Sequence, residues 1–490
     1  MLNCNDLVQT HYYRNIPVTG PSPEQIAIEE LQRDVEELTS DLATTNSDLT
    51  ILTTDFNDFK DKFIIVYPTD TDEVVQQKIN TPNVSKIIFA KGTYNNITTT
   101  KTIPSNKTLI GYGAKIVAPS SIQWIVFQND SNGTVGGYAA NENINLLGFE
   151  FDCSNLLSGQ GASCLGFLHC NHIHIKDCKF THMFTGGHFI ELNATTASSI
   201  EDCYFYDFTG TEMIQLDKAS DKGTYPVIPN GPWDDTACSS ISIINNTFEN
   251  TPSFTDEHGA DTFPAAIGNH NHNGDPISHI KVIGNTFARM TTALRFVEVR
   301  SSVFANNTQH NGFNFFSCGS DTISVKAGSL TGNIFIGNVM NAHAKSAEVT
   351  PANSYKHSGI SYNGTNTIFS NNYLWNYSAD GIQIRGDNNV VSNNRIMDCG
   401  RNGIDIIDSH GIVITGNTCT NNAGKKADAS DSDIRESGQT DCNVTGNTVH
   451  TMYSKTTAGG NIIANNIITR TLNNTGAAAH GNMINGTWTA

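Results

Sequence analysis

The chain has 490 residues, 41 of them glycine, with 16% charged residues and a formal net charge of −18 at pH 7. Nucleic-acid binding needs a basic face, so this charge balance argues against nucleic acid as a partner. No apolar run approaches membrane-spanning length, and residues 1–22 lack the basic and apolar regions of a signal peptide. We therefore expect cytoplasmic synthesis and no membrane insertion.

A heptad repeat follows the arm at residues 1–22. Between Ile28 and Phe63 apolar residues recur every seven positions along two seams, and only Thr45 interrupts them. This pattern predicts a coiled coil over residues 23–63, because such a stripe is covered well by another copy of the same helix. A lone helix packed on the body is the alternative, and the seam does not by itself choose between two and three chains.

A short repeat fills most of the remaining chain. Between Leu146 and Ile468 an apolar stretch is repeatedly followed by Asn-Asn, Asn-Thr or Asp-Cys, and the closest copies lie 22 to 25 residues apart. A leucine-rich repeat has a similar period, but leucine is scarce here and no half of the repeat has a helical pattern. The repeat predicts an all-β fold, a single-stranded right-handed parallel β-helix, whose inward side chains stack about 4.8 Å apart.

The turns of this repeat contain asparagine and cysteine. Asparagine tolerates left-handed backbone, so the Asn-x-Thr copies are predicted to be stacked turns rather than glycosylation sites. The eleven cysteines show no metal-ligand spacing. Cys178 and Cys203 occupy the same place in consecutive repeats, which predicts stacked, buried thiols in a protein that folds in a reducing compartment.

Two phrases near the start of the repeat region carry a family resemblance. They are Lys86-Ile87-Ile88-Phe89-Ala90-Lys91-Gly92-Thr93-Tyr94 and Thr108-Leu109-Ile110-Gly111-Tyr112-Gly113-Ala114, after a predicted short helix at residues 70–79. They resemble the opening of the pectate-lyase-like β-helix superfamily, as used by bacteriophage tailspikes and capsule depolymerases. Ala90-Lys91 departs from that pattern, which has Pro-Pro or Pro-Ala there. The resemblance spans about residues 64–470 and is specific for fold rather than for chemistry.

The resemblance implies an organisation and a function. The parts are an arm (1–22), a coiled coil (23–63), a capping helix with the first strands (64–120), the β-helix (121–470) and an end segment (471–490). The implied protein is a homotrimer in a virion tail, made in the bacterial cytoplasm, that cleaves a bacterial surface polysaccharide at the host surface. It needs no cofactor, and its arm is expected to contact other tail or baseplate proteins.

Aligned strands predict one cluster of polar side chains on the outside of the β-helix. If the isoleucines and leucines of four consecutive rungs face the core, the residues between them point outward. One file then contains Glu191, Gln215, Gly268 and Arg295, and a parallel file contains Asn193, Asp217 and His270.

Two carboxyl groups of this cluster predict acid–base chemistry. Glu191 and Asp217 would lie about 8 Å apart, since one rung and two residues separate them. That separation suits an inverting glycosidase, so we predict Glu191 and Asp217 as the acid–base pair and His270 as their partner. Because carboxylates on an exposed face rarely support a fold, we expect their substitution to leave stability unchanged.

A polysaccharide lyase is the alternative chemistry for the same cluster. There a His or Arg moves the proton, and a cation such as Arg295 or Lys218 neutralises a uronate carboxylate. Insertions at residues 218–235 and 251–263 are expected to build a groove wall whose aromatic residues stack on sugars. The predicted substrate-binding residues are Gln215, Arg295, Trp233, Tyr225, Asp235 and His188.

The remaining motifs carry weaker predictions. His270 and His272 lack a third ligand in a recognisable frame, so no metal site is predicted. A second outward patch, an extended sugar subsite or plain surface, consists of Gln383, Arg385, Asp387, Asp405 and Asp408. Two other functions stay open, a non-catalytic receptor-binding protein that recognises a surface glycan and a secreted polysaccharide lyase. The heptads and the missing signal peptide disfavour the second.

Overall fold

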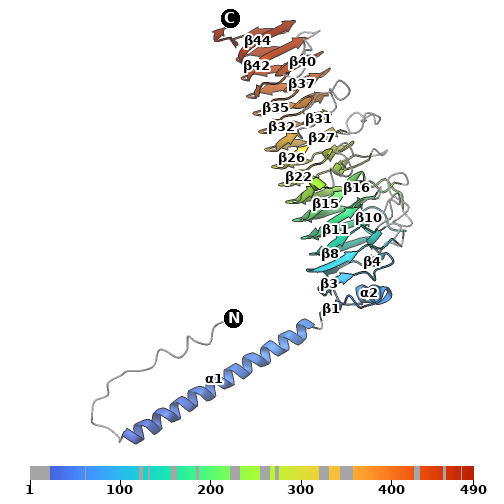
Figure 1. Cartoon of the computed structure of the whole chain (residues 1–490), viewed down its shortest axis with the longest axis vertical. Coiled ribbons are helices and arrows are strands. Elements are labelled where there is room, and N and C mark those ends of the chain that lie inside the picture. The colour runs from blue at the N-terminus through green and yellow to red at the C-terminus, as the bar shows by residue number, and fades with distance from the viewer. Residues whose placement is uncertain are drawn as a thin grey trace. The chain divides into compact units, whose positions relative to one another are not determined.

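The computed structural model divides the chain into two units, residues 1–62 and 63–490 (Figure 1). The structure describes residues 23–60, 62–120, 125–130, 133–155, 163–183, 187–220, 232–253, 265–270, 275–318, 330–342, 357–423, 431–455, 460–475 and 477–489.

The described part of the first unit is helix α1 (Pro23–Lys60), which contains the heptads. Its apolar seam faces solvent in the single chain. The seam residues Leu31, Val35, Leu38, Leu42 and Leu49 are 54 to 67% exposed. In the described residues, we find no helix with the length and apolarity needed to cross a membrane. The helix lies where the sequence predicts it, and its association into a coiled coil stays a prediction.

We expect light scattering of the full chain to give the mass of three chains. Soluble proteins rarely leave an apolar stripe of this size bare, which predicts self-association, and the tailspike resemblance implies three copies. Introducing charge into the seam with Leu38→Asp and Leu42→Asp should lower the oligomeric state. The β-helix should stay folded by circular dichroism, since each coil is stabilised by its neighbours. Glu37→Gln, off the seam, is the matched control. A monomer mass for the intact chain would contradict the prediction.

Helix α2 (Asp72–Ile79) follows the first strand of the second unit and lies close to the predicted position. The side chain of Thr71 accepts a hydrogen bond from the backbone N–H of Val74 and so caps the helix. Val75 and Ile79 are buried and join the core of the β-helix. The first coils are therefore closed by an amphipathic helix.

The second unit is a parallel β-helix in which successive coils contribute strands to three columns. The first column contains β1 (Phe63–Val66), β2 (Lys86–Phe89), β5 (Lys107–Ile110), β8 (Asn141–Leu147), β11 (Cys170–Lys176), β14 (Thr196–Glu201), β17 (Ser239–Ile244), β20 (Ile277–Ser278), β21 (Lys281–Ile283), β24 (Val299–Arg300), β25 (Val303–Ala305), β28 (Leu330–Thr331), β29 (Ile334–Ile336), β32 (Ile368–Ser370), β35 (Val390–Ser392), β38 (Val413–Thr415), β41 (Asn443–Thr445), β43 (Ile462–Ala464) and β45 (Ala478–His480).

The second column contains β3 (Gly92–Tyr94), β6 (Ala114–Val117), β9 (Glu150–Asp152), β12 (Lys179–Met183), β15 (Tyr204–Phe208), β18 (Thr247–Glu249), β22 (Thr286–Ala288), β26 (Thr308–Gly312), β30 (Val339–Ala342), β33 (Tyr373–Trp375), β36 (Arg395–Met397), β39 (Thr418–Thr420) and the first residues of β42 (Thr448–Lys455) and β44 (Ile467–Thr475), then β46 (Met483–Ile484). β46 pairs with β47 (Thr487–Trp488), the one antiparallel pair among the described strands. Parallel pairing thus continues beyond residue 470.

The third column contains β4 (Lys101–Ile103), β7 (Ile125–Asn129), β10 (Ser163–Leu168), β13 (Ile190–Asn193), β16 (Glu212–Asp217), β19 (Ala265–Gly268), β23 (Thr292–Arg295), β27 (Asn314–Ser317), β31 (Ile360–Asn363), β34 (Ile382–Arg385), β37 (Ile404–Ile407), β40 (Ile434–Ser437) and the later residues of β42 and β44. This column carries the candidate site.

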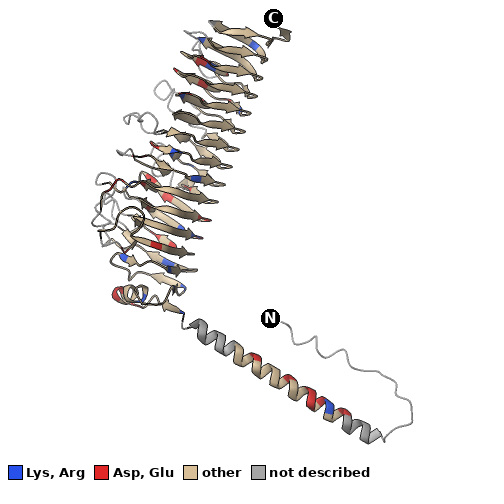
Figure 2. Ribbon diagram, turned by 180° about the vertical axis from the view of Figure 1, so that it is seen from behind, with Lys and Arg blue, Asp and Glu red and all other residues tan. Residues whose placement is uncertain are grey.

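Identical side chains stack along the core, as the predicted rung spacing requires. Five phenylalanines of the second column, Phe151, Phe180, Phe205, Phe248 and Phe287, form one stack whose neighbouring ring centroids lie 4.8 to 5.1 Å apart. Cys178 and Cys203 are buried free thiols on adjacent coils, as predicted, and the backbone N–H of Cys178 approaches the Sγ of Cys203 at 3.4 Å. Charged residues are sparse on the coils, so stacking of apolar groups dominates their packing (Figure 2).

The asparagine turns form a buried ladder between the first and second columns. Its members are Asn246, Asn285, Asn307, Asn338, Asn372, Asn394, Asn417, Asn447, Asn466 and Asn482. From Asn246 to Asn466, each Nδ2 donates to the Oδ1 of the next asparagine at 2.9 to 3.1 Å. The residue before each ladder asparagine, such as Asn245 or Gly284, has the left-handed backbone. In an Asn-Asn pair, the first residue therefore makes the bend and the second makes the ladder.

Candidate active site

The strand register confirms the first of the two predicted files and part of the second. Glu191 pairs with Gln215 on the next rung, Gln215 with Gly268, and Gly268 with Arg295. Asn193 pairs with Asp217. The alternate residues, among them Ile190 and Leu216, belong to the hydrophobic core. The polar residues therefore share one face, which the period of two along a strand required.

The two carboxylates are not exposed, which corrects the sequence-based expectation. Glu191 and Asp217 are each 1% exposed. Strand alternation identifies the face to which a side chain points but not what covers that face. The expectation that both substitutions leave stability unchanged, which assumed solvated carboxylates, is therefore wrong in its premise.

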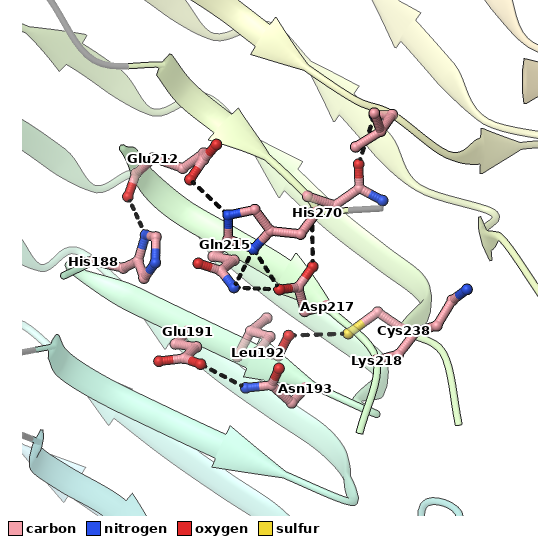
Figure 3. A network of polar contacts seen from close by, with 12 residues as sticks. His188, Glu191, Leu192, Asn193, Glu212, Gln215, Asp217, Lys218, Cys238 and His270 are labelled. Carbon is pink, nitrogen blue, oxygen red and sulfur yellow. Dashed lines mark hydrogen bonds and ion pairs between the residues drawn. The ribbon is translucent and has the colours of Figure 1, made fainter. Parts of the chain in front are cut away.

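His270 lies between two carboxylates (Figure 3). Its Nδ1 donates to Asp217 Oδ2 at 2.9 Å, and its Nε2 lies 3.9 Å from Glu212 Oε2. The backbone N–H of His270 also donates to Asp217 Oδ1 at 2.9 Å, and the Gln215 amide donates to Asp217 Oδ2. Burial lowers the pKa of His270, but the hydrogen bond to Asp217 and the charges of Asp217 and Glu212 outweigh it and raise the pKa to about 9.

Glu212 is a member of the cluster that the sequence analysis missed. It is completely buried, and Oε1 accepts a hydrogen bond from Arg295 Nη1 at 3.1 Å. Gly268 makes room for it, because a Cβ at residue 268 would lie 2.9 Å from Glu212 Cγ. Counting back from Ile214 by alternation places residue 212 on the core side, so the pattern excluded it. The signal in the sequence was a glutamate at a position where alternation predicts a core residue.

Glu191 lies in surroundings different from those of Asp217. Oε1 accepts a hydrogen bond from Asn193 Nδ2 at 3.1 Å, and Oε2 lies 3.5 Å from Ser163 Oγ. Burial raises the pKa of the Glu191 carboxyl; His188 and the Asn193 bond oppose the rise, and the charge of Asp217 adds to it. The protonated form of Glu191 therefore persists to a higher pH than in a solvated glutamate.

The predicted substrate-binding residues differ in how far they are exposed to solvent. His188 is buried, and its Nδ1 donates to the carbonyl oxygen of Glu212 at 2.6 Å, because a carbonyl can only accept. Trp233 is 39% exposed. Asp235 is exposed and its backbone N–H donates to the carbonyl of Ala219, two residues after Asp217. Tyr225, His272 and most of the two predicted insertions lie outside the described residues.

Lys218 is not available to a substrate, which corrects its prediction as a possible cation. Its side chain is fully buried, and Nζ pairs with Glu298 at 2.8 Å. Lys218 directly follows Asp217, the last residue of β16, so the chain turns there and strand alternation no longer fixes its direction. Glu298, far along the sequence, could not be identified from the strand pattern.

The second patch divides into buried and exposed residues. Gln383 donates to Asp380 at 3.0 Å, and Arg435 Nη1 lies 3.4 Å from Asp405. Burial and the charge of Asp380 raise the pKa of Asp405 to about 7, against the opposing effect of Arg435 and Arg401. The other members of the patch lie towards solvent: Arg385 and Asp408 are exposed and Asp387 is half-buried. Only part of the predicted patch is therefore plain surface.

Comparisons with known proteins support the fold. A family model described as the right handed beta helix region matches residues 265–468. The tailspike protein of E. coli bacteriophage HK620, solved in complex with a pentasaccharide, has a TM-score of 0.55 and 12% identity over 88% of this chain and 78% of its own. Tailspike protein 3 of bacteriophage CBA120 has a TM-score of 0.53 and 11% identity over 88% of this chain and 62% of its own.

A bacterial protein has a similar fold. PfbA, a surface adhesin of Streptococcus pneumoniae, has a TM-score of 0.54 and 19% identity over 73% of this chain and 88% of its own. No curated protein matches the chain in sequence. Identities this low relate folds rather than activities. The resemblance to tailspike-type proteins is thus confirmed at the level of fold, and the described part of the second unit forms a right-handed parallel β-helix.

Proposed function

We propose that this chain is a tailspike-like depolymerase that hydrolyses glycosidic bonds of a bacterial surface polysaccharide. The observation that carries the proposal is the pair Glu191 and Asp217. They lie on adjacent rungs of one face, and their carboxyl groups have different surroundings and different hydrogen-bond partners. Burial favours the protonated form of Glu191 by raising its pKa. Asp217 accepts hydrogen bonds from His270 and Gln215, which suit an ionised carboxylate. An inverting glycosidase needs one group of each kind.

The cluster supplies a role for each neighbour. Glu191 would protonate the leaving oxygen, and Asp217 would take a proton from the attacking water. His270 and Arg295, with side chains 36% and 27% exposed, are the members that a saccharide would meet first. We assign to them and to Gln215 the positioning of the sugar. The likeness to two phage tailspikes supports a trimeric protein of a virion tail, acting at the host surface.

The test is incubation of the full chain with a panel of purified bacterial capsular polysaccharides and exopolysaccharides. Reducing ends and chain length by size-exclusion chromatography are measured on the same samples. A depolymerase generates reducing ends and short oligosaccharides from at least one polymer. Binding of a polymer in affinity electrophoresis with no change of its chain length would overturn the enzymatic proposal.

That second outcome describes the rival function, a glycan-binding protein without catalysis. One observation favours it: Glu191 and Asp217 are each 1% exposed, so a ligand could occupy the outer part of the cluster without reaching either carboxyl. A binder would contact His270 and Arg295 and leave the polymer intact. The two functions therefore predict opposite results in the chain-length measurement.

The pH profile should distinguish hydrolysis from elimination. With a pKa of about 9, His270 keeps its proton at neutral pH and cannot abstract another one. Elimination with His270 as the base should therefore accelerate as the pH rises towards 9. Hydrolysis needs protonated Glu191, so we expect kcat/KM to fall as the pH rises through the raised pKa of this carboxyl. An alkaline increase together with absorbance from an unsaturated uronate would instead identify a lyase.

A further inference from the structure

We infer that the sugar residue bound at the cluster around Glu191 and Asp217 is uncharged, a neutral hexose rather than a uronate. The inference rests on the proposed function and names the substrate class of the same site. It stands on how the cations of the cluster are paired and on which polar atoms have no partner.

Three cationic side chains in the described part of this cluster, those of Arg295, His270 and Lys218, already pair with a carboxylate. Arg295 Nη1 lies 3.1 Å from Glu212 Oε1, and His270 Nδ1 lies 2.9 Å from Asp217 Oδ2. Lys218, which directly follows Asp217, is fully buried against Glu298. An incoming uronate carboxylate would have to displace one of these partners, because paired opposite charges present little net field to a third one. No pair is more than partly exposed, so water would compensate poorly.

Among the described residues of the cluster, the polar atoms left without a hydrogen bond are acceptors. Asn193 Oδ1 and Gln215 Oε1 are buried and accept none from a described residue, and Glu212 Oε2 has only His270 Nε2 nearby, at 3.9 Å. Asn193 and Gln215 direct their amide nitrogens to the carboxylates of Glu191 and Asp217, which leaves their oxygens turned away (Figure 3). Buried acceptors require donors, and a hexose offers several hydroxyl donors. A uronate replaces a hydroxymethyl donor with a charged group that can only accept.

The charge of the whole chain acts in the same direction. At −18 it disfavours the approach of a polyanion, unless a local excess of cations attracts it. The paired cations of this cluster do not supply that excess. Short-range pairing and long-range charge thus both select against an acidic sugar at this position.

The experiment uses one polymer in two forms. An exopolysaccharide that the wild-type chain retards in affinity electrophoresis, with both neutral hexoses and a uronic acid in its repeat, is tested native and after chemical reduction of its carboxyl groups to hydroxymethyl groups. We expect retardation and cleavage rate to agree within about twofold between the two forms, with oligosaccharides of the same length. Arg295→Gln should change KM by the same factor for both forms.

A loss of retardation or cleavage on carboxyl reduction, about tenfold or more, would overturn the inference. So would an Arg295→Gln effect confined to the native form, since this would show Arg295 binding the uronate. If both forms are retarded equally and neither is shortened, the neutral-sugar inference stands and the proposed hydrolase fails. The two failures are therefore distinguishable in one set of measurements.

Discussion

Glu191→Gln is expected to reduce polysaccharide cleavage about a hundredfold or more, the usual scale for removing a general acid. Glutamine has the shape of glutamate and preserves an acceptor for Asn193 Nδ2, but it cannot give a proton to the leaving oxygen. Because burial already disfavours the charged form of Glu191, an uncharged amide should fit with little loss of stability. Initial rates from reducing ends, and melting followed by circular dichroism, measure the two effects.

Glu201→Gln is the matched control for this experiment. Glu201 lies at the end of β14, in the first column, where it is half-buried and lies 4.0 Å from Lys176 Nζ rather than beside a residue of the cluster. Its substitution should leave the rate unchanged. If Glu191→Gln keeps near wild-type turnover on a verified substrate, Glu191 is not the acid.

Asp217→Asn should also reduce the rate, but its effect on catalysis is harder to separate from its effect on stability. His270 would lose the carboxylate that raises its pKa most, so its protonated form would be destabilised and the melting temperature should fall as well. A lower rate for this variant alone could therefore reflect damage to the cluster.

Glu436→Gln is expected to stabilise the protein by about 3 kcal/mol at neutral pH and by little at acidic pH. Glu436 in β40 faces the core, beside Ile406 on the preceding rung and Ser454 on the following one. Burial raises its pKa to about 7, and the neighbouring Ser454 side chain opposes part of that rise. The folded chain therefore holds a proton that the unfolded chain releases near the ordinary pKa of 4.5.

The sign of the pH dependence follows from this difference. Between pH 4.5 and about 7 the folded state binds more protons, so the free energy of unfolding of the wild type decreases as the pH rises and levels off above 7. Glutamine does not titrate, so the variant loses this dependence. Urea unfolding at about pH 4.5 and about pH 7.5 measures the effect. Glu142→Gln, at an exposed position, is the control, and equal gains at both pH values would contradict the prediction.

The outward files could be predicted because both of their determinants are local. The repeat spacing brings Glu191 and Gln215 to the same height on adjacent rungs, and alternation sends both to one side. The partners of Lys218 and Arg295 could not be predicted in the same way. Strict alternation has ended at both Glu298 and Glu212. Next to Glu212, for example, the consecutive residues Met213 and Ile214 are both buried in the core.

Burial of the cluster was also beyond the sequence pattern. Spacing gives the rung and the side of the sheet for Glu191, but not how closely neighbours such as Ser163 and Asn193 pack against its carboxyl group. The heptad seam is the opposite case, because a strict period predicts the helix that the structure describes. Period thus predicts the scaffold, whereas the solvent exposure of a side chain also depends on packing that has no sequence period.

Along the asparagine ladder, the number of residues in a coil varies while the distance between neighbouring coils stays constant. Its consecutive members are from 16 to 39 residues apart in sequence, yet every connecting bond measures 2.9 to 3.1 Å. Each added segment must therefore begin and end between two consecutive ladder asparagines. In such a chain the segments around the candidate site can be exchanged, lengthened or shortened while the ladder keeps its register.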